Sequence, residues 1–532
     1  MSSEARRRVA YPHLIYWFLF AQGGVVAAVL VPVHVLIQGI LGPLGIVPVV
    51  DRHYDTWVAM LGNPIVKLYL LVLIAVPFFH IAHRVRYLLT DFGVKSAKSV
   101  PAQVISDRGV GLVVDPLRDI ERYLKLADDL HVKITHALDT HLHNDYVSGR
   151  RELAAEVGAN IDELNPGHDL HIGDMTLRAI HTPGHTPDHK SFLLHEGGRD
   201  RALFSGGAVM LGAIARTDLF GPHLAVHLAL EALSTLQVRL RNLPDDIRVF
   251  PTHGGGSFCG TGGRSGHETT LGHERQTNPF FLTTEVMPFL ARALSQHRYP
   301  TYYRDMAAIN RGGPPLIGRT PPALTRLAAD EVGRMMDDGA AVVDVRTGRE
   351  YDRGHVPGSY SVGIDGPVSA WVGWLIARGR PLVLVGGTDN ELRKAQRQLL
   401  RIGFDTIAGV LDGGTDSWRS SGRELSTFET VDVEDMAQWV LSAEPMTVVD
   451  ARDEHEWVAG HVPGAVHMYV PDVPHRAGEI PREAPVAVHC ASGYRAGIAA
   501  SLLEQAGLTR IIHVNGEYSD WDRLHLAESV PT

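Results

Sequence analysis

The chain has little cysteine, no excess of basic charge and, near its start, hardly any charge at all. Its 532 residues include two cysteines, Cys259 and Cys490, which are too few for a disulfide framework and favour a reducing compartment. The formal net charge of -10 argues against a nucleic-acid partner, because such a partner requires a basic face. With 45% hydrophobic residues the chain has material for several cores, so we expect a multidomain protein.

The first hundred residues contain two long apolar stretches. Residues 14–50 contain no Asp, Glu, Lys or Arg, and residues 57–82 contain only Lys67. About 20 apolar residues cross a bilayer as a helix, so the sequence predicts a two-span α-helical hairpin rather than a signal peptide. Basic residues precede the first stretch, at 6–8, and follow the second, at 84–98. The positive-inside rule therefore predicts a multi-pass protein of the inner cell membrane with its later domains in the cytoplasm.

Both stretches resemble the D subunit of fumarate reductase, a small membrane anchor of a respiratory complex. The resemblance is carried by "YWFLFAQGGVVAAVLVPVHVLIQGILGPLGIVP" and "NPIVKLYLLVLIAVPFFHIAHRVRYLLTDFGV". It implies an anchor over residues 1–98, with the lipid bilayer and fumarate reductase subunits as partners. That family has three spans, whereas this sequence shows two.

From about residue 99 short apolar strands alternate with amphipathic helices. "GVGLVVDP" predicts a strand, "RDIERYLKLADDL" a helix and "KITHALDTH" the next strand. The turn "THLHNDY" follows at once, and its His141, His143 and Asp145 have a spacing that suits a divalent ion. Three further pieces come in order: "HTPGHTPDHKSFLL" with His185, "ALFSGGAVMLGAIARTDL", and "RVFPTHGGGSFCG" with His253.

These ordered pieces resemble the metallo-β-lactamase fold, and "TPGHTP" with "ARTDL" resembles its persulfide dioxygenase and glyoxalase II-like branch. The resemblance implies an αββα domain over residues 99–300. It implies metal ligands at His141, His143, Asp145, His185 and His253. Two further ligands of the two-metal hydrolases are replaced by Tyr146 and Gly207, so we expect one divalent metal, held first of all by His141, His143 and His185.

The identity of the metal is left open by the sequence. In the persulfide dioxygenases, iron is held by two of these histidines and by the carboxylate whose position is now Gly207. We favour iron over zinc, with a metal-free remnant as the third alternative. Asp145, His189 and Asp218 are the candidates for a substitute donor. Cys259 lies in a glycine-rich loop, and we expect it to pack in the core rather than to bind a metal.

Beyond a Gly-Pro-rich linker the chain repeats itself. "AAVVDVRTGREYDRGHVPGSYSV" is echoed by "MTVVDARDEHEWVAGHVPGAVHM", and a repeat of this length means tandem domains rather than a solenoid. Both copies resemble rhodanese modules. The resemblance implies two α/β domains, over residues 320–425 and 428–532.

The second copy carries a thiol where sulfur transfer needs one. "VAVHCASGYRAG" places Cys490 at a strand end and Arg495 near the start of a helix. The loop between them consists of Ala491, Ser492, Gly493 and Tyr494. Loop N–H groups, the helix N-terminus and Arg495 stabilise a thiolate or a persulfide. The first copy has Gly386 in the corresponding stretch, so we expect it to carry no sulfur.

The pieces together predict a membrane-anchored enzyme of sulfur metabolism. Cys490 would take sulfur from thiosulfate or a low-molecular-weight persulfide and pass it to glutathione or a similar thiol, and the metal domain would oxidise persulfide with iron. A metal-dependent thioester hydrolase of the glyoxalase II type is the rival enzyme. A non-enzymatic anchor of a fumarate reductase-like complex is the other alternative, and an accidental fusion of two genes near residue 98 is a further one.

Overall fold

The computed structural model describes residues 104–523 except 255–256, 265, 267, 296–297 and 443–444, together with Asn63, Pro64 and Lys67. The two expected membrane spans lie outside the described residues, apart from those last three. Among the residues that are described, no helix is long and apolar enough to cross a bilayer. The chain divides into two units, Met1–Val100 and Pro101–Thr532.

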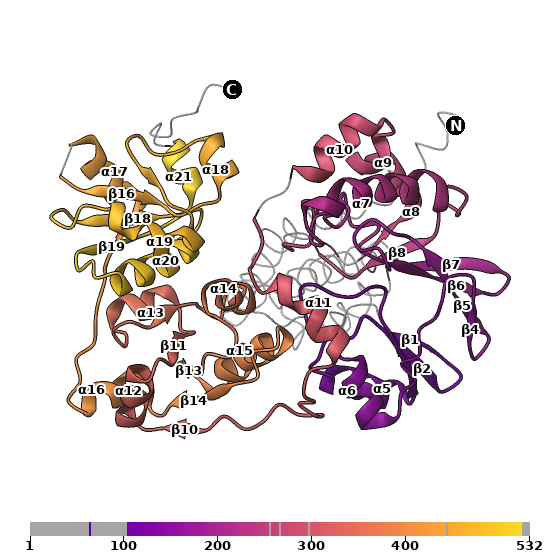
Figure 1. Cartoon of the computed structure of the whole chain (residues 1–532), viewed down its shortest axis with the longest axis horizontal. Helices are drawn as coiled ribbons and strands as arrows, with labels where there is room; N and C mark the ends of the chain where they lie inside the picture. The colour runs from indigo at the N-terminus through magenta and orange to yellow at the C-terminus, as the bar shows by residue number, and fades with distance from the viewer. Residues whose placement is uncertain are drawn as a thin grey trace. The chain divides into compact units, whose positions relative to one another are not determined.

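Two sheets packed face to face, with helices on both outer sides, form the first part of the second unit (Figure 1). One sheet has the order β1 (Val104–Asp107), β2 (Val110–Val114), β3 (Lys133–Leu138). The other has the order β4 (Asp169–Ile172), β5 (Met175–His181), β6 (Lys190–Glu196), β7 (Arg199–Gly206), β8 (Arg248–Pro251), β9 (Thr269–Thr270). The helices are α5 (Glu121–Leu130) and α6 (Arg150–Val157) on the first sheet, and α7 (Pro222–Ser234), the π-helix η4 (Thr235–Arg239), α8 (Leu271–Thr277), α9 (Pro279–Leu282) and α10 (Val286–Leu294) on the second.

Apolar side chains on the facing strands fill the space between the two sheets. Leu112 and Val114 of β2 pack in one cluster with Leu177 of β5 and Phe192 of β6. The strand, helix and strand expected at the start of this domain are present as β2, α5 and β3. The αββα architecture expected from the sequence is therefore confirmed.

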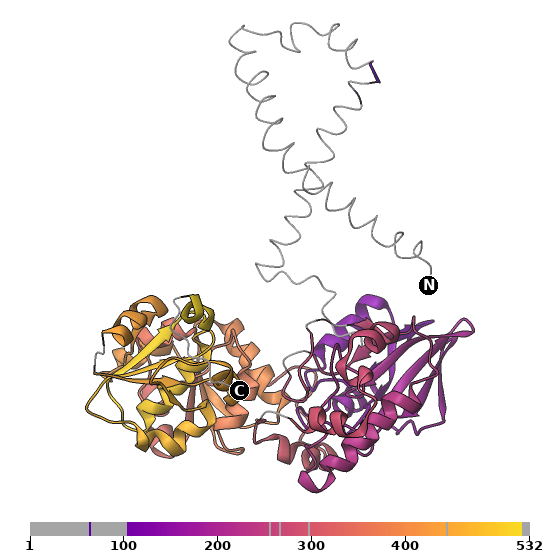
Figure 2. The same cartoon turned by 90° about the horizontal axis from the view of Figure 1, so that it is seen from above.

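Two five-stranded, all-parallel sheets follow, with one strand order used twice (Figures 1 and 2). After α11 (Tyr303–Gly312), the first module contains β10 (Arg326–Leu327), α12 (Ala329–Asp337), β11 (Ala341–Asp344), α13 (Gly348–Arg353), β12 (Tyr360–Ser361), α14 (Val368–Leu375), β13 (Leu382–Val385), α15 (Asp389–Arg401), β14 (Ile407–Leu411) and α16 (Gly414–Ser420). The second module contains β15 (Glu429–Asp432), α17 (Val433–Leu441), β16 (Thr447–Asp450), α18 (Glu454–Ala459), β17 (Val466–His467), η5 (Val470–Asp472), α19 (Val473–Arg476), η6 (Ala477–Glu479), β18 (Val486–His489), α20 (Tyr494–Gln505), β19 (Ile511–Asn515) and α21 (Tyr518–Arg523). The orders β10-β14-β13-β11-β12 and β15-β19-β18-β16-β17 are equivalent, so the internal repeat expected from the sequence is confirmed.

The same ion pair supports both modules at the end of a buried strand. Asp344 binds Arg346 at 2.5 Å in the first module, and Asp450 binds Arg452 at 2.6 Å in the second. Each arginine also donates to the carbonyl of a glycine in the Gly-His-Val-Pro-Gly turn. The Asp-x-Arg motif is therefore structural, and the chemistry lies at the carboxyl ends of the central strands.

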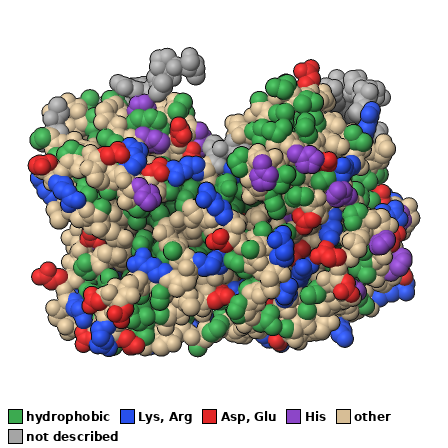
Figure 3. Space-filling model, viewed as in Figure 1, with side chains coloured by type: hydrophobic (Ala, Val, Ile, Leu, Met, Phe, Trp, Pro, Cys, Tyr) green, Lys and Arg blue, Asp and Glu red, His purple; other side chains and the backbone are tan. Residues whose placement is uncertain are grey.

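Charged side chains are mixed by sign on the molecular face seen in Figure 3. Lys and Arg alternate with Asp and Glu there, in keeping with the small acidic excess of the sequence. This face therefore offers no continuous basic surface of the kind that nucleic acids require.

Candidate functional site

The histidine-rich turn begins directly after β3 and is fastened by Asp115, which follows β2. Thr140 donates to the Asp115 carboxylate through its backbone N–H at 2.6 Å and through its hydroxyl at 2.8 Å. The hydroxyl of Thr252, at the end of β8, donates to the same carboxylate. The ends of β2, β3 and β8 therefore meet at the buried Asp115 carboxylate, and these hydrogen bonds fix the position of the histidine-rich turn.

Four buried histidines around this turn each have one ring nitrogen engaged. Their contacts are Nδ1 of His141 to the Thr140 hydroxyl (2.8 Å), Nε2 of His143 to Asp115 (3.1 Å), Nδ1 of His185 to the Arg216 carbonyl (2.7 Å) and Nδ1 of His253 to Asp145 (3.2 Å). The second nitrogen of every ring is buried and meets no hydrogen-bond partner among the described residues. For His141 and His185 these contacts place the N–H on the engaged nitrogen and leave a lone pair on the other, which is how metal-binding histidines are prepared. Burial lowers the pKa of His143, but the charge of Asp115 outweighs it and the pKa rises to about 9, so a metal must displace a proton from this ring.

Three of these side chains gather closely enough to share one ion. One ligand atom each from His141, His185 and His253 lies within 4.8 Å of the others. The ring of His143 lies beside that of His141, with ring centroids 4.3 Å apart. The donors therefore fit a divalent metal, since buried imidazole lone pairs without a donor are satisfied by a cation.

Burial keeps two of the histidines neutral. It lowers the pKa of His185 to about 3, with the charge of His253 adding to the effect, and it lowers the pKa of His141 well below the usual value, with His143 contributing. Neutral imidazole is the form that binds a metal. Burial raises the pKa of Asp145, but the charge of His253 outweighs it and the pKa falls to about 2, so this carboxyl is ionised.

The two positions where the sequence departs from two-metal hydrolases are filled in other ways. A Cβ atom on Gly207 would lie 2.8 Å from the Cδ2 atom of His185, so no carboxylate side chain fits there. The Tyr146 hydroxyl donates to the Asp115 carbonyl at 3.3 Å, and its ring stacks on His143. Both ligands are therefore absent for steric or hydrogen-bonding reasons visible in the structure.

Of the three expected substitute donors, only Asp145 remains available. His189 accepts the Gly207 N–H at 2.9 Å through Nε2, and its other nitrogen contacts a threonine hydroxyl. Asp218 binds the Arg216 guanidinium at 2.7 Å through both oxygens. The Oδ1 atom of Asp145 is buried with no hydrogen-bond partner among the described residues, so the expectation for His189 and Asp218 is corrected.

A side chain from beyond the expected domain boundary holds the metal turn, and no motif in the sequence points to it. Asn310, on α11, donates to the carbonyls of His143 (2.9 Å) and Tyr146 (2.8 Å), and accepts from the backbone of Ser148. The sequence predicts that the metallo-β-lactamase-like domain ends at residue 300, and α11 lies just beyond that point. This domain boundary stays a prediction. An amide at the edge of a linker-like stretch carries no spacing by which sequence alone could find it.

The thiol of the second rhodanese-like module lies shortly before the N-terminus of a helix. Cys490 follows β18, is 3% exposed and precedes a short loop that leads into α20. Gly493 ends the loop with φ +82°, and a Cβ atom there would lie 2.8 Å from Asn515. Cys490 therefore lies between the end of β18 and the short loop that leads into the N-terminus of α20, in the order that the spacing predicts.

A carboxylate fixes the cation beside this thiol. Glu456, on α18, binds Arg495 through two contacts, at 2.5 and 2.8 Å. Burial lowers the pKa of Arg495, but the bond and charge of Glu456 outweigh it and the pKa lies above the usual value. The guanidinium therefore stays charged and oriented next to Cys490.

The first module touches the loop that follows Cys490 in the second module, residues 491–494. His513, on β19, contacts the Gly493 carbonyl at 2.9 Å through one nitrogen and the Asp352 carboxylate of the first module at 2.8 Å through the other. The Tyr494 hydroxyl donates to the Gly363 carbonyl of the first module at 2.9 Å. The loop is thus held from both modules.

A side chain at the corresponding position of the first module would crowd a leucine. A Cβ atom on Gly386 would lie 2.7 Å from the Cδ2 atom of Leu392. The helix that follows, α15, begins with Asp389 and Glu391, which place negative charge where an anionic sulfur would bind. Both features agree with the expectation that this module carries no sulfur.

Comparisons with known proteins match three parts of the chain. Residues 6–107 match the family of the fumarate reductase D subunit, and residues 328–421 and 432–524 match the rhodanese-like domain family. The fumarate reductase D subunit of Mycobacterium bovis is 43% identical over 93 residues, which are 18% of this chain and 70% of that protein. Hydroxyacylglutathione hydrolase GloC of Haemophilus influenzae is 26% identical over 202 residues, 32% of this chain and 85% of that protein.

A solved structure resembles a longer stretch. The crystal structure of a metallo-β-lactamase from Staphylococcus aureus covers 58% of this chain and 94% of its own, with 28% identity and a TM-score of 0.52. The part of the chain that the structure describes therefore consists of a metallo-β-lactamase fold followed by two rhodanese domains.

Proposed function

Because the chain belongs to the fumarate reductase D-subunit family through residues 6–107 and continues into a metallo-β-lactamase fold and two rhodanese domains, we propose that it is a membrane-anchored sulfurtransferase of sulfur metabolism. The observation that carries the proposal is the surrounding of Cys490. The thiol precedes a short loop whose glycine caps α20, and Arg495 in the first turn of that helix is paired with Glu456, so loop N–H groups, helix N-terminus and guanidinium are available to the sulfur. This arrangement holds a negative sulfur and binds the negative charge of a donor.

Sulfur transfer through Cys490 takes two displacements. The Cys490 thiolate attacks the outer sulfur of thiosulfate or of a low-molecular-weight persulfide, and the old S–S bond breaks. Sulfite or a thiolate leaves with the electron pair, and Cys490 becomes a persulfide. The thiolate of glutathione, or of a similar thiol, then attacks the outer sulfur and leaves as the persulfide, which restores the Cys490 thiolate. Since Cys490 is 3% exposed, small donors are favoured.

The metal domain would act on the persulfide product. His141 and His185 would hold the metal, with His143 or His253 as a further donor and Asp145 as the nearby carboxylate. A bound ferrous ion would supply the activation of dioxygen needed to oxidise persulfide sulfur to sulfite. The residues of this chain keep His141 and His185 neutral, orient the ligand rings through their engaged nitrogens and shield the cage from bulk water.

A zinc-dependent thioester hydrolase is the second candidate. It is supported by the similarity to a protein named hydroxyacylglutathione hydrolase. The close contact between position 207 and His185 disfavours it, because a two-metal hydrolase needs a bridging carboxylate there.

The anchor completes the proposal. Residues 6–107 would hold the enzyme at the inner cell membrane as a multi-pass protein with its catalytic domains in the cytoplasm. Fumarate reductase subunits are the proposed partners of this segment, and the lipid bilayer is its surroundings.

Substitution of the thiol tests the sulfurtransferase. In full-length protein, C490S is expected to lower transfer of sulfur from thiosulfate to cyanide by about a hundredfold or more, because a hydroxyl forms no persulfide. C490A is the matched control, because it shows whether the serine hydroxyl itself affects sulfur transfer. Circular dichroism checks that both variants are folded. Unchanged transfer in the two variants would remove the proposal.

A further inference from the structure

The second cysteine of the chain lies beside the histidine cage, where neither sulfur transfer nor persulfide oxidation gives it a task. One ligand atom each from Asp145, His253 and Cys259 lies within 4.8 Å of the others. These residues come from the turn after β3, the end of β8 and the loop that follows β8. We propose that Cys259 is a metal ligand, which with Asp145 and His253 forms a second donor set for a divalent cation that accepts sulfur, such as Zn²⁺.

The unpartnered atoms in this set indicate a ligand. Cys259 is fully buried and His253 is 4% exposed. Nε2 of His253 and Oδ1 of Asp145 are both buried, and neither has a hydrogen-bond partner among the described residues. Because a buried carboxylate oxygen and a buried imidazole lone pair are both acceptors, they cannot satisfy each other, whereas a cation satisfies both.

The donor types and their charges suit a dication. Imidazole nitrogen, carboxylate oxygen and thiolate sulfur are all ligands of Zn²⁺. Asp145 and the thiolate of Cys259 bring two negative charges, which balance the ion, and the thiol proton is released to water as the ion binds. A cage of histidines alone brings no such charge.

The backbone around Cys259 holds it in place from two sides. The Arg216 N–H donates to the Cys259 carbonyl at 2.7 Å, and the Cys259 N–H donates to the Ser257 hydroxyl at 3.2 Å. The thiol is therefore positioned by contacts that do not depend on the metal. A preorganised donor of this kind is what a metal site requires.

The new set also accounts for how two ions divide the cage. His253 lies within 4.8 Å of His141 and His185 as well, but one imidazole nitrogen binds one ion. If His253 serves the set with Cys259, the first ion retains His141 and His185. Cys259 thereby replaces, from a different loop, the ligands lost at Tyr146 and Gly207.

Cobalt substitution tests this inference without measuring catalysis. Full-length C490S protein contains Cys259 as its one remaining thiol, because the sequence has two cysteines. The protein is stripped with a chelator and titrated with Co²⁺ alone. We expect a thiolate-to-cobalt charge-transfer band in the near ultraviolet and two bound ions per chain, and we expect C259S in the same background to lose the band and one ion.

The C490S protein alone shows whether Cys259 is a metal ligand, even if adding C259S impairs folding. If it binds cobalt without the charge-transfer band, Cys259 is not a ligand and the inference is wrong. Sulfurtransfer by wild-type protein is assayed separately. The proposed function and this inference can therefore fail independently.

Discussion

At the scale of single residues, Tyr146 explains why the ligands of the cage differ from those of the two-metal hydrolases. Burial, followed by the charge of Asp115, raises the pKa of Tyr146 well above its usual value. The phenol therefore stays neutral and hydrogen-bonded to the Asp115 carbonyl, rather than acting as an anionic ligand. The change from imidazole to phenol removes a metal ligand, and the phenol ring stacks on the ring of His143 instead.

Glu456 is expected to control the affinity for an anionic sulfur donor. In E456Q, Arg495 loses its charged partner and its fixed orientation, so the KM for thiosulfate should rise about tenfold while kcat changes little, a loss of about 1.4 kcal/mol. Steady-state sulfurtransfer kinetics measure this. E479Q is the control, because it breaks an exposed Arg476–Glu479 pair in the same domain by the same chemical change. Equal changes in both variants would contradict the role given to Glu456.

His141, His143 and Cys490 are predictable from the sequence because each lies in a short motif whose spacing is itself the signal. The groups that hold them come from other strands and helices. Asp115 precedes the turn by a whole helix, and Asn310 follows it by most of the domain. The glycine-rich loop around Cys259 suggests packing alone, because the distance of this thiol from Asp145 depends on how the sheets fold together.

At the scale of elements, β19 of the second module connects the loop that follows Cys490 to α13 of the first. His513 meets two acceptors, the Gly493 carbonyl and the Asp352 carboxylate. One ring nitrogen of His513 therefore faces each module. The module without a thiol thus supplies the charge that fixes this histidine under the loop.

Removing that charge is expected to slow sulfur transfer. In D352N the His513 ring loses its anionic partner and the Gly493 contact weakens, so kcat/KM for thiosulfate should fall about tenfold. E504Q is the matched control, since Glu504 binds His355 across the same two modules at 3.2 Å but does not touch the loop. The two variants should lose similar thermal stability, and a similar loss of kcat/KM in both would refute the positioning role.

The repeated modules were predictable as elements because their strands are short, apolar and bounded by the same turn motif. The sheet order and the repeat follow from that pattern. The contacts between the modules do not, because nothing in the pattern shows that His355 of the first module and His513 of the second become buried where the two modules meet.

At the scale of the whole molecule, the first rhodanese module contacts both candidate sites. The Val147 N–H, one residue after Tyr146, donates to the carbonyl of Arg401 at the end of α15 at 2.6 Å. Arg118, fully buried, reaches Asp405 of the same module. The module that carries no thiol therefore supports the metal turn as well as the loop that follows Cys490.

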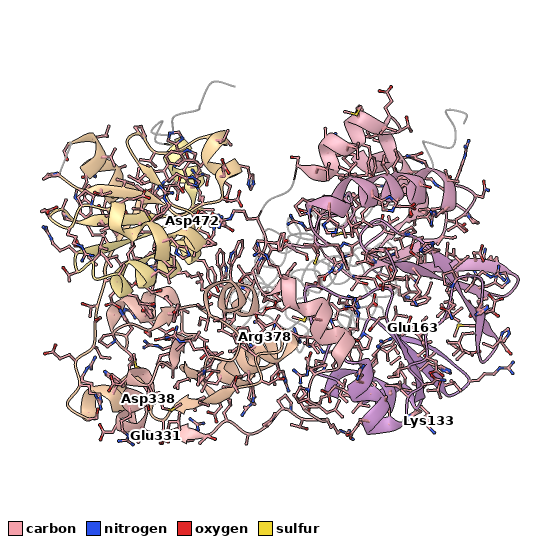
Figure 4. All side chains as sticks on the ribbon, in the orientation of Figure 1. Lys133, Glu163, Glu331, Asp338, Arg378 and Asp472 are labelled. Atoms are coloured by element: carbon pink, nitrogen blue, oxygen red, sulfur yellow. The ribbon has the colours of Figure 1, made fainter. Side chains whose placement is uncertain are left out.

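A further ion pair joins the second module to the segment that follows the metal domain. Arg298 binds Asp472, which is labelled in Figure 4, through contacts of 2.7 and 2.8 Å. Because the pair is partly exposed, we expect a contribution of at most about 1 kcal/mol to stability. These contacts depend on tertiary packing, so the sequence could not predict which surfaces of the modules meet.

The anchor makes a separate prediction. Full-length protein in cells should sediment with membranes and remain there after an alkaline carbonate wash, because apolar spans are held by the bilayer rather than by charge. A chain that begins at residue 101 should appear in the supernatant. Release of the full-length protein by the wash would contradict membrane insertion of residues 6–107.

Oxygen uptake by the iron-loaded, full-length protein tests most directly whether the two sites act on the same sulfur. With thiosulfate and glutathione as substrates, we predict uptake that is lost in both C490S and H185A. With glutathione persulfide supplied directly, we predict that C490S retains uptake and H185A does not. Uptake that survives H185A, or no uptake from glutathione persulfide in wild-type protein that still transfers sulfur, would contradict a coupled sulfurtransferase and persulfide oxidase.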